Sequence, residues 1–163
     1  MLDQPLGGLW IGTFHGIAHR LLRQHWQEVR LPRAFQVLDS GDQLRLVKRV
    51  LRDLGLDEKK WPPQPATSFI NRCKDDGQRP ADVIDDHTVA QRQYLRIYTI
   101  YQQECERSGL VDFGELLLRV YELWRDHPDL LAHYRERFQH VLVDEFQDTN
   151  ASQYQWVQLL SSN

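Results

Sequence analysis

The sequence predicts a mostly α-helical protein flanked by two strand and helix pieces of a parallel α/β domain. Two observations predict the helical part, because apolar residues recur at helical spacing across residues 44–54 and again across residues 94–105. A third predicts the α/β part, since residues 141–143 form a continuous apolar run, typical of a buried parallel strand, that ends in adjacent carboxylates.

Composition is that of a soluble globular protein. Of 163 residues, 41% are hydrophobic and 26% are charged, which is enough for one core and one compact unit. The net charge of -3 does not indicate a general nucleic-acid surface, so any nucleic-acid contact must be local. The isolated Cys73 and Cys105 indicate reduced thiols in a core or helix face rather than a disulfide framework or zinc site. Without a long apolar stretch or signal-peptide pattern, we expect a cytoplasmic protein and no membrane contact.

The N-terminal half is predicted to contain a strand and two helices. Residues 9–13 are typical of a short strand, and the helix after it has apolar positions at helical spacing, namely Ile17, Leu21, Leu22 and Trp26. Ser40, with Gln43 three residues later, predicts the N-cap of the second helix, and Gly55 predicts its end. The buried face of that helix is expected to comprise Leu44, Val47, Val50, Leu51 and Leu54.

The middle of the chain is predicted to be a connector, a short helix, a loop and a long helix. Residues 61–65 contain three prolines and favour a rigid extended connector, because proline fixes its own φ and biases the preceding residue away from helix. A short helix with Phe69, Ile70 and Cys73 should end at Gly77, before a polar loop over residues 78–87. Residues 89–107 predict an amphipathic helix with Gly109 as its cap. Its tyrosines could be base-stacking platforms, but their spacing favours core packing.

Asp112 predicts the N-cap of the next helix, with Glu115 at the capping-box position. Its buried face should extend to Pro128 and comprise Phe113, Leu116, Leu117, Val120 and Trp124. In this interpretation Asp112 and Phe113 only cap and anchor the helix. A final strand follows the apolar residues Leu130, Leu131, Tyr134 and Phe138. The helix after that strand carries the apolar residues Tyr154, Val157 and Leu160.

The carboxylates that follow the apolar run are candidates for a nucleotide-hydrolysis site. Ligands of open α/β sheets gather beyond the carboxyl ends of the strands, where Asp144 and Glu145 are expected. The first carboxylate can hold a hydrated Mg²⁺ ion, and the second can orient and deprotonate a water molecule. Taken alone, such a pair is more often a solvated strand end or a helix start.

Three motifs together resemble superfamily 1 DNA helicases of the UvrD/Rep/PcrA type. VLVDEFQDTN (residues 141–150) resembles their Walker B region, GTFHG (residues 12–16) their single-strand DNA contact motif, and GLVDF (residues 109–113) the segment that closes their helical insertion. Motif order and spacing match over essentially the whole chain. The resemblance implies a mostly α fold, with a 1B-like helical insertion domain at residues 28–138. It is flanked by strand–helix remnants of a RecA-like α/β motor domain of the P-loop NTPase type, at residues 1–27 and 139–163.

The resemblance also implies the activity of an intact parent protein. That protein would be an ATP-dependent 3′–5′ DNA helicase acting in DNA repair, with ATP and Mg²⁺ as cofactors. Its partners would be single-stranded DNA, DNA junctions and DNA repair proteins. Asp144 would bind Mg²⁺, Glu145 would activate water with Gln147 beside it in the catalytic site, and Gln147 and Asp148 would link the nucleotide to the DNA path.

By the same resemblance, Thr13, Phe14 and His15 would contact the DNA strand. A strand end that leads into a helix offers backbone donors, a hydroxyl and rings suited to phosphates and bases. The alternative is that Thr13 only caps the helix and Phe14 packs inside. His15 and His19 have the spacing of zinc-protease ligands, but Gly16 stands where such a protease has its glutamate, which argues against a metalloprotease site.

These residues contain no G-x-x-x-x-G-K-[ST] phosphate loop. That loop supplies the donors that hold the phosphates of ATP, so we expect the chain alone to be inactive as an ATPase, to bind no cofactor, and to be an internal fragment of the helicase. The competing interpretation is a non-catalytic helical module that docks DNA or protein.

Overall fold

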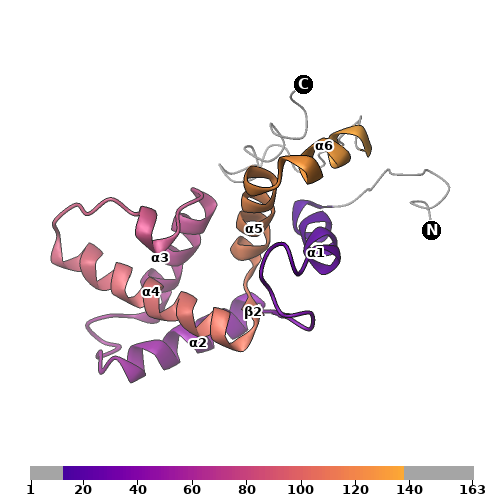
Figure 1. Cartoon of the computed structure of the whole chain (residues 1–163). Helices are drawn as coiled ribbons and strands as arrows, with labels where there is room; N and C mark the ends of the chain where they lie inside the picture. The colour runs from indigo at the N-terminus through magenta and orange to yellow at the C-terminus, as the bar shows by residue number, and fades with distance from the viewer. Residues whose placement is uncertain (1–12, 138–163) are drawn as a thin grey trace. The chain divides into compact units, whose positions relative to one another are not determined.

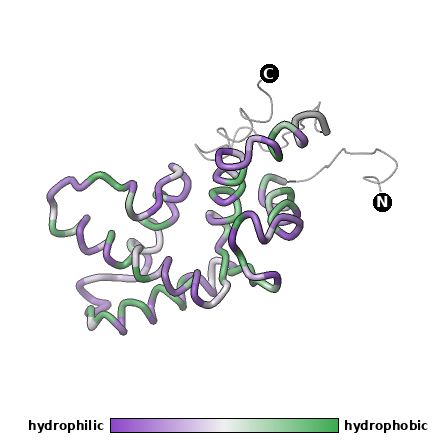
Figure 2. Tube along the Cα trace, viewed as in Figure 1, coloured by the Kyte–Doolittle hydropathy of each residue, from purple (hydrophilic) through white to green (hydrophobic). Residues whose placement is uncertain are grey.

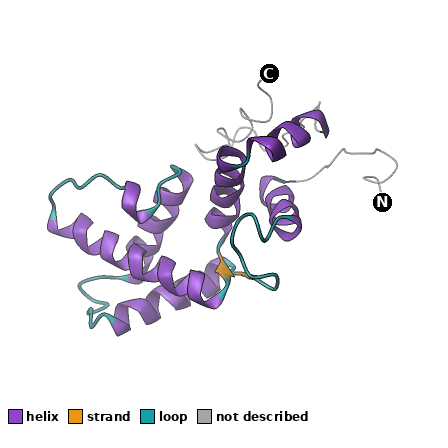
Figure 3. Ribbon diagram, viewed as in Figure 1, coloured by secondary structure: helices purple, strands orange, loops and turns teal. Residues whose placement is uncertain are grey.

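The computed structural model describes residues 13–137 of the chain (Figure 1). The described residues are mostly helical, with one pair of short strands (Figure 3), which confirms the predicted helical character. The single compact unit expected from composition is wrong, because the chain divides into two compact units. Unit 1 comprises Met1–Arg33 and Leu116–Asn163, and unit 2 comprises Ala34–Glu115. The predicted domain boundaries at residues 27/28 and 138/139 stay predictions. The strand expected at 141–143, most of that at 9–13, and the final helix lie outside the described residues.

Unit 2 is built on three helices, α2 (Ser40–Asp53), α3 (Pro63–Asp75) and α4 (Val89–Ser108). Apolar and polar residues alternate along them at helical spacing (Figure 2), so each helix presents one apolar face. Those faces form a single core of Leu46, Val47, Val50, Leu51, Ala66, Phe69, Ile70, Cys73, Ile97, Tyr98, Tyr101 and Cys105. Both cysteines are free and buried, as predicted.

The start of α2 differs from the prediction by one residue. Asp39, not Ser40, is the N-cap, and its Oδ1 accepts a hydrogen bond from the backbone N–H of Asp42 at 2.8 Å. Either residue type caps well, so the local pattern did not distinguish them. The predicted end is confirmed, because Gly55 adopts φ +72 directly after the C-cap residue. On the buried face, Leu46 is 7% exposed, whereas Leu44 is only partly buried.

The predicted extended connector over residues 61–65 is wrong for its second half. Pro62 is the N-cap of α3, and Pro63 and Pro65 lie in the first turn. The first backbone N–H groups of a helix have no acceptor within it, so prolines there forfeit no hydrogen bond. The predicted end near Gly77 is confirmed, since Gly77 adopts φ +74 shortly after α3. The loop that follows contains one turn of 3-10 helix, η1 (Pro80–Asp82).

The tyrosines of α4 belong to the core. Tyr98 and Tyr101 are completely buried, which confirms the core interpretation and leaves neither ring face open to a base. Tyr94 is partly buried between Trp61 and Phe69, with ring centroids 5.6 Å from each. Gly109 ends the helix with φ +67, as predicted.

A short parallel strand pair joins the start and the end of unit 2. Strand β1 (Gln36–Val37) pairs with β2 (Leu110–Val111) in the register Gln36 with Leu110 and Val37 with Val111. This pair was not predicted, because strands of two residues leave no periodic pattern. It places the chain entry of unit 2 beside the GLVDF segment.

The described part of unit 1 contains α1 (Phe14–Gln24), the larger part of α5 (Phe113–Asp126), and α6 (Pro128–Arg137). Helix α1 ends at Gln24, so Trp26 lies beyond the helix and not in it as predicted. The predicted buried face of α5 is confirmed for Leu116, Leu117, Val120 and Trp124, but Phe113 is 47% exposed. Phe113 has the spacing of this face, but it is the first residue of α5 and directly follows the capping residue. Among the described residues, no helix combines the length and apolar character needed to cross a membrane.

Candidate functional site

The DNA-contact motif of the sequence lies at the start of α1, in unit 1. Thr13 is the N-cap residue, and its hydroxyl accepts a hydrogen bond from the backbone N–H of Gly16 at 3.1 Å. Phe14 is 6% exposed, and His15 is partly buried. The structure thus assigns Thr13 a capping role and Phe14 a packed position, the two structural roles that the sequence left open. Contact of Thr13, Phe14 and His15 with DNA stays a prediction.

His19 lies one turn further along α1 and pairs with a cation. The Nε of Arg23 donates to the Nε2 of His19 at 3.1 Å. Burial, and then the positive charge of Arg23, lower the pKa of His19 below its usual value. The described residues contain no group of three or more potential metal ligands, so the pair His15 and His19 has no described third ligand.

The nucleotide-site candidates, Asp144, Glu145, Gln147 and Asp148, lie outside the described residues, so their geometry is not described. The third motif, residues 109–113, lies wholly within unit 2 and carries a buried charge cluster.

Asp112 is the centre of that cluster, and its two carboxylate oxygens have different partners. Its Oδ1 accepts the backbone N–H of Glu115 at 2.8 Å, which caps α5 and confirms the predicted N-cap. Its Oδ2 lies 2.7 Å from the Nζ of Lys74 on α3 and accepts the hydroxyl of Tyr101 on α4 at 2.5 Å. Lys74 is 1% exposed and Asp112 is 2% exposed. One carboxylate therefore joins the cap of α5 to two helices of unit 2.

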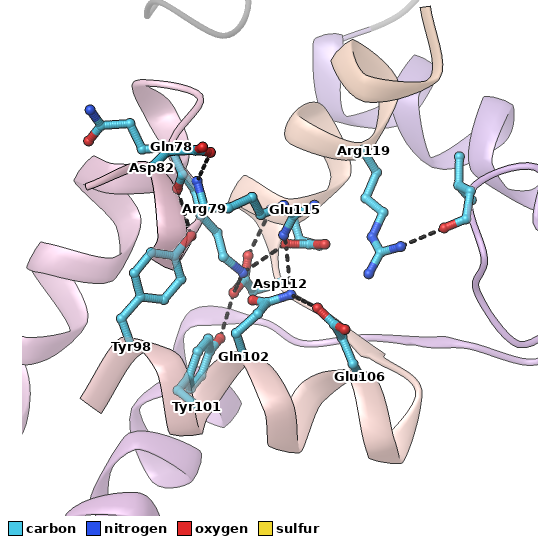
Figure 4. Close-up of polar contacts among 12 residues, drawn as sticks. Gln78, Arg79, Asp82, Tyr98, Tyr101, Gln102, Glu106, Asp112, Glu115 and Arg119 are labelled. Carbon is cyan, nitrogen blue, oxygen red and sulfur yellow. Dashed lines mark hydrogen bonds and ion pairs between the residues drawn. The ribbon is translucent and has the colours of Figure 1, made fainter. Parts of the chain in front are cut away.

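Glu115 is the second acid of the cluster. Its Oε1 lies 3.0 Å from the Nζ of Lys74 and 2.7 Å from the Nη1 of Arg79, and it is also 3.4 Å from the Nε2 of Gln102. Figure 4 shows Arg79 and Gln102 converging on Glu115 from different elements of unit 2. Two acids thus face two bases, so the cluster is neutral as a whole.

Electrostatics favour the charged form of Lys74. Burial acts to lower the pKa of Lys74, but the carboxylates of Asp112 and Glu115 outweigh it and hold that pKa above its usual value. Burial, followed by the charge of Asp112, raises the pKa of Tyr101. Lys74 is therefore a protonated cation and Tyr101 a neutral donor at physiological pH. A lysine locked in its ammonium form cannot act as a nucleophile or a base, so the cluster is suited to holding structure rather than to catalysis.

Sequence reasoning did not single out Lys74, although one signal was present. Lys74 lies four residues after Ile70 and seven after Thr67, so it continues the buried face of α3. A buried lysine on an apolar helix face needs a buried acid as its partner. That acid is Asp112, which lies 38 residues away in the sequence.

Comparison of the chain with known proteins identifies its family. A family model described as the UvrD/REP helicase N-terminal domain matches residues 1–163. The chain is 54% identical over 163 residues to DNA helicase II of Escherichia coli (strain K12), covering 100% of this chain and 23% of that protein. It is 56% identical over 159 residues to DNA helicase II of Haemophilus influenzae, covering 98% of this chain and 22% of that protein.

A relative of lower sequence identity is also named a DNA helicase. The ATP-dependent DNA helicase PcrA of Leuconostoc citreum is 38% identical over 154 residues, covering 94% of this chain and 21% of that protein. The chain spans less than a quarter of the length of these relatives, all of which are named DNA helicases. Because the model of the UvrD/REP helicase N-terminal domain matches residues 1–163, the chain belongs to the UvrD/REP helicase family.

Proposed function

We propose that these residues work within a longer polypeptide, the parent helicase, which unwinds duplex DNA by ATP-driven 3′–5′ translocation on single-stranded DNA during DNA repair. The observation that carries the proposal is the match of the helicase N-terminal domain to residues 1–163, which include the DEFQDT string. The direction of movement and the repair role follow from the resemblance of the three motifs. Single-stranded DNA, DNA junctions and repair proteins are the proposed partners.

The ATP site of the parent helicase would include the carboxylates after the apolar run at residues 141–143. Asp144 would hold Mg²⁺, because hard carboxylate oxygens are the protein ligands that this ion prefers. Bound Mg²⁺ would supply positive charge beside the phosphates. Glu145 would orient the attacking water and accept its proton, and Gln147 and Asp148 would link the nucleotide to the DNA path.

The test of this site is ATP hydrolysis by the parent helicase. We expect hydrolysis that single-stranded DNA stimulates, and unwinding of a duplex with a 3′ tail but not of one with a 5′ tail. Glu145→Gln should abolish hydrolysis while ATP still binds, because it removes the base and keeps the shape. Glu58→Gln, at an exposed position of unit 2, is the matched control and should have no effect. Full hydrolysis by the Glu145→Gln variant would contradict the assigned role.

The chain alone should hydrolyse no ATP, because no phosphate loop occurs in it. Turnover by the pure chain would overturn that expectation. A useful companion experiment is fluorescence anisotropy with a short labelled single strand across a range of salt concentrations, because phosphate attraction depends on salt more strongly than stacking does.

In that titration, His15→Ala should weaken binding, whereas His87→Ala, at an exposed position of unit 2, should not. Phe14→Ala should also weaken binding. Because Phe14 is buried, circular dichroism must first show that the Phe14→Ala variant is folded. Binding that both histidine variants leave unchanged would favour the alternative of a docking module that does not use the α1 motif.

A further inference from the structure

We propose that Lys74 and Asp112 are positioning residues that clamp the first turn of α5 to unit 2, and that this clamp couples unit 2 to DNA unwinding in the parent helicase. The inference rests on the proposed function. It assigns a role to a buried ion pair that neither the nucleotide site nor the DNA-contact motif uses.

Chain connectivity gives α5 its importance. The boundary between the units falls inside α5, after Glu115, so one continuous helix begins in unit 2 and ends in unit 1. The other connection, at residues 33/34, lies in an irregular stretch between α1 and β1. Rigid secondary elements can carry energetic coupling between distant sites, so the way in which unit 2 holds the first turn of α5 sets what this helix can couple.

The clamp holds that turn from several directions. Lys74 comes from α3 and Tyr101 from α4, and both meet the Oδ2 of Asp112, while the Oδ1 of Asp112 holds the backbone of Glu115. Figure 4 shows the Tyr101 contact beside the contacts of Arg79. A shift of α5 along its axis would leave buried charges unpaired, which is costly, so only one position of the first turn satisfies the cluster.

Gly114 lets the same turn approach Lys74 closely. A Cβ atom at Gly114 would lie 3.2 Å from the Cβ of Lys74, so the backbone of α5 rests against the aliphatic stem of this lysine. Packing and charge therefore act on the same side chain. Buried ion pairs add little net stability compared with apolar packing, and their best attested use is to select one geometry. That property suits a positioning role.

The variant that tests the clamp is Lys74→Met with Asp112→Asn in the parent helicase. The pair loses one positive and one negative charge, so the buried charge stays balanced, and Glu115 keeps Arg79 as its partner. The Asp112→Asn change preserves the cap of α5, because asparagine is as good an N-cap as aspartate. We expect hydrolysis of ATP stimulated by single-stranded DNA to stay within about twofold, while base pairs unwound per ATP fall about tenfold.

Two controls separate positioning from loss of stability. Ile70→Val removes one methylene from the core of unit 2 without touching the cluster, and Arg49→Ala breaks the exposed ion pair with Glu104. Neither should change the base pairs unwound per ATP. An equal fall in Ile70→Val, at the same loss of thermal stability, would overturn the proposal, as would unchanged coupling in the double variant.

If the double variant does not fold, the single variant Asp112→Asn tests the clamp instead. In this variant Lys74 keeps Glu115 as its ion-pair partner. A folded Asp112→Asn variant with reduced base pairs per ATP supports the clamp, and one with unchanged coupling overturns it. Failure of the proposed function is a different result, because the unmodified parent helicase would then hydrolyse no ATP and unwind no DNA.

Discussion

Tyr101 donates its hydroxyl to the Oδ2 of Asp112 at 2.5 Å, although Tyr101 is 0% exposed and Asp112 only 2%. A hydrogen bond to a charged acceptor is among the stronger ones in proteins, and burial removes competition from water. The same hydroxyl accepts from the Nε2 of Gln43 at 3.3 Å, so it links α2 to the start of α5 through α4.

Tyr101→Phe should therefore destabilise the chain by about 2 kcal/mol, because the carboxylate loses a hydrogen bond while it stays buried. Chemical denaturation followed by circular dichroism measures this change. Tyr94→Phe removes a hydroxyl from the same helix at a partly buried position and should cost less. Equal stability of Tyr101→Phe and the unmodified chain would mean that the hydroxyl contributes nothing.

The raised pKa of Tyr101 gives this contact a pH dependence. The native state keeps the proton above about pH 10, where an unfolded tyrosine begins to lose it. The stability from the protonated hydroxyl is thus fully present below about pH 10 and is lost as the pH rises above it. Unfolding measured between about pH 9 and pH 11 should show a smaller loss in Tyr101→Phe than in the unmodified chain.

Lys74→Met alone should be far more damaging than its paired variant. It takes the Lys74 ammonium away from two buried carboxylates, and removing one partner of a buried ion pair typically costs about 3–5 kcal/mol. Arg49→Ala breaks an exposed ion pair and should cost less than about 1 kcal/mol. Denaturation midpoints of the two variants test this, and a loss in Lys74→Met no larger than in Arg49→Ala would refute the energetic role of the cluster.

The sequence predicted the periodic parts of this fold and missed what depends on distant contacts. The long stripe of α4 and the cap at Asp112 were predicted because their signals are local. The partnership of Lys74 was missed because charged side chains usually face water, and only the fold reveals the acid that permits burial. Pro63 and Pro65 led to the wrong prediction of an extended connector, because the effect of a proline depends on whether it lies inside a helix or in its first turn.

The nucleotide site stays a prediction from a motif. The residue types of DEFQDT indicate its chemistry, but its geometry lies outside the described residues. Thr13 and Phe14 have local structural roles, as a cap and a packed ring, that the motif alone cannot separate from contact with DNA.

The N-cap of α2, which is Asp39 and not the predicted Ser40, can be tested directly. Asp39→Ala should destabilise the chain by about 1 kcal/mol, because it removes the acceptor for the backbone N–H of Asp42. Ser40→Ala should have almost no effect, since Ser40 is the first helical residue rather than the cap. Thermal or denaturant unfolding of both variants is sufficient, and a larger loss in Ser40→Ala would restore the capping assignment made from the sequence.

His19 should be neutral at pH 7, which limits the charge that α1 can present to a phosphate. Burial, and then the charge of Arg23, lower its pKa, and the hydrogen bond from the Nε of Arg23 requires an unprotonated Nε2. As the pH falls, the unfolded chain takes up a proton near pH 6.5 before the native state does. The associated stability is therefore present above pH 6.5 and is lost as the pH falls through the lowered pKa.

An NMR titration of the imidazole resonances tests this directly. Arg23→Ala should move the pKa of His19 upward, toward 6.5, because it removes the neighbouring positive charge but not the burial. Arg45→Ala, a surface change in unit 2, should leave the titration unchanged. A pKa of His19 that does not respond to loss of Arg23 would mean that burial alone keeps this ring neutral.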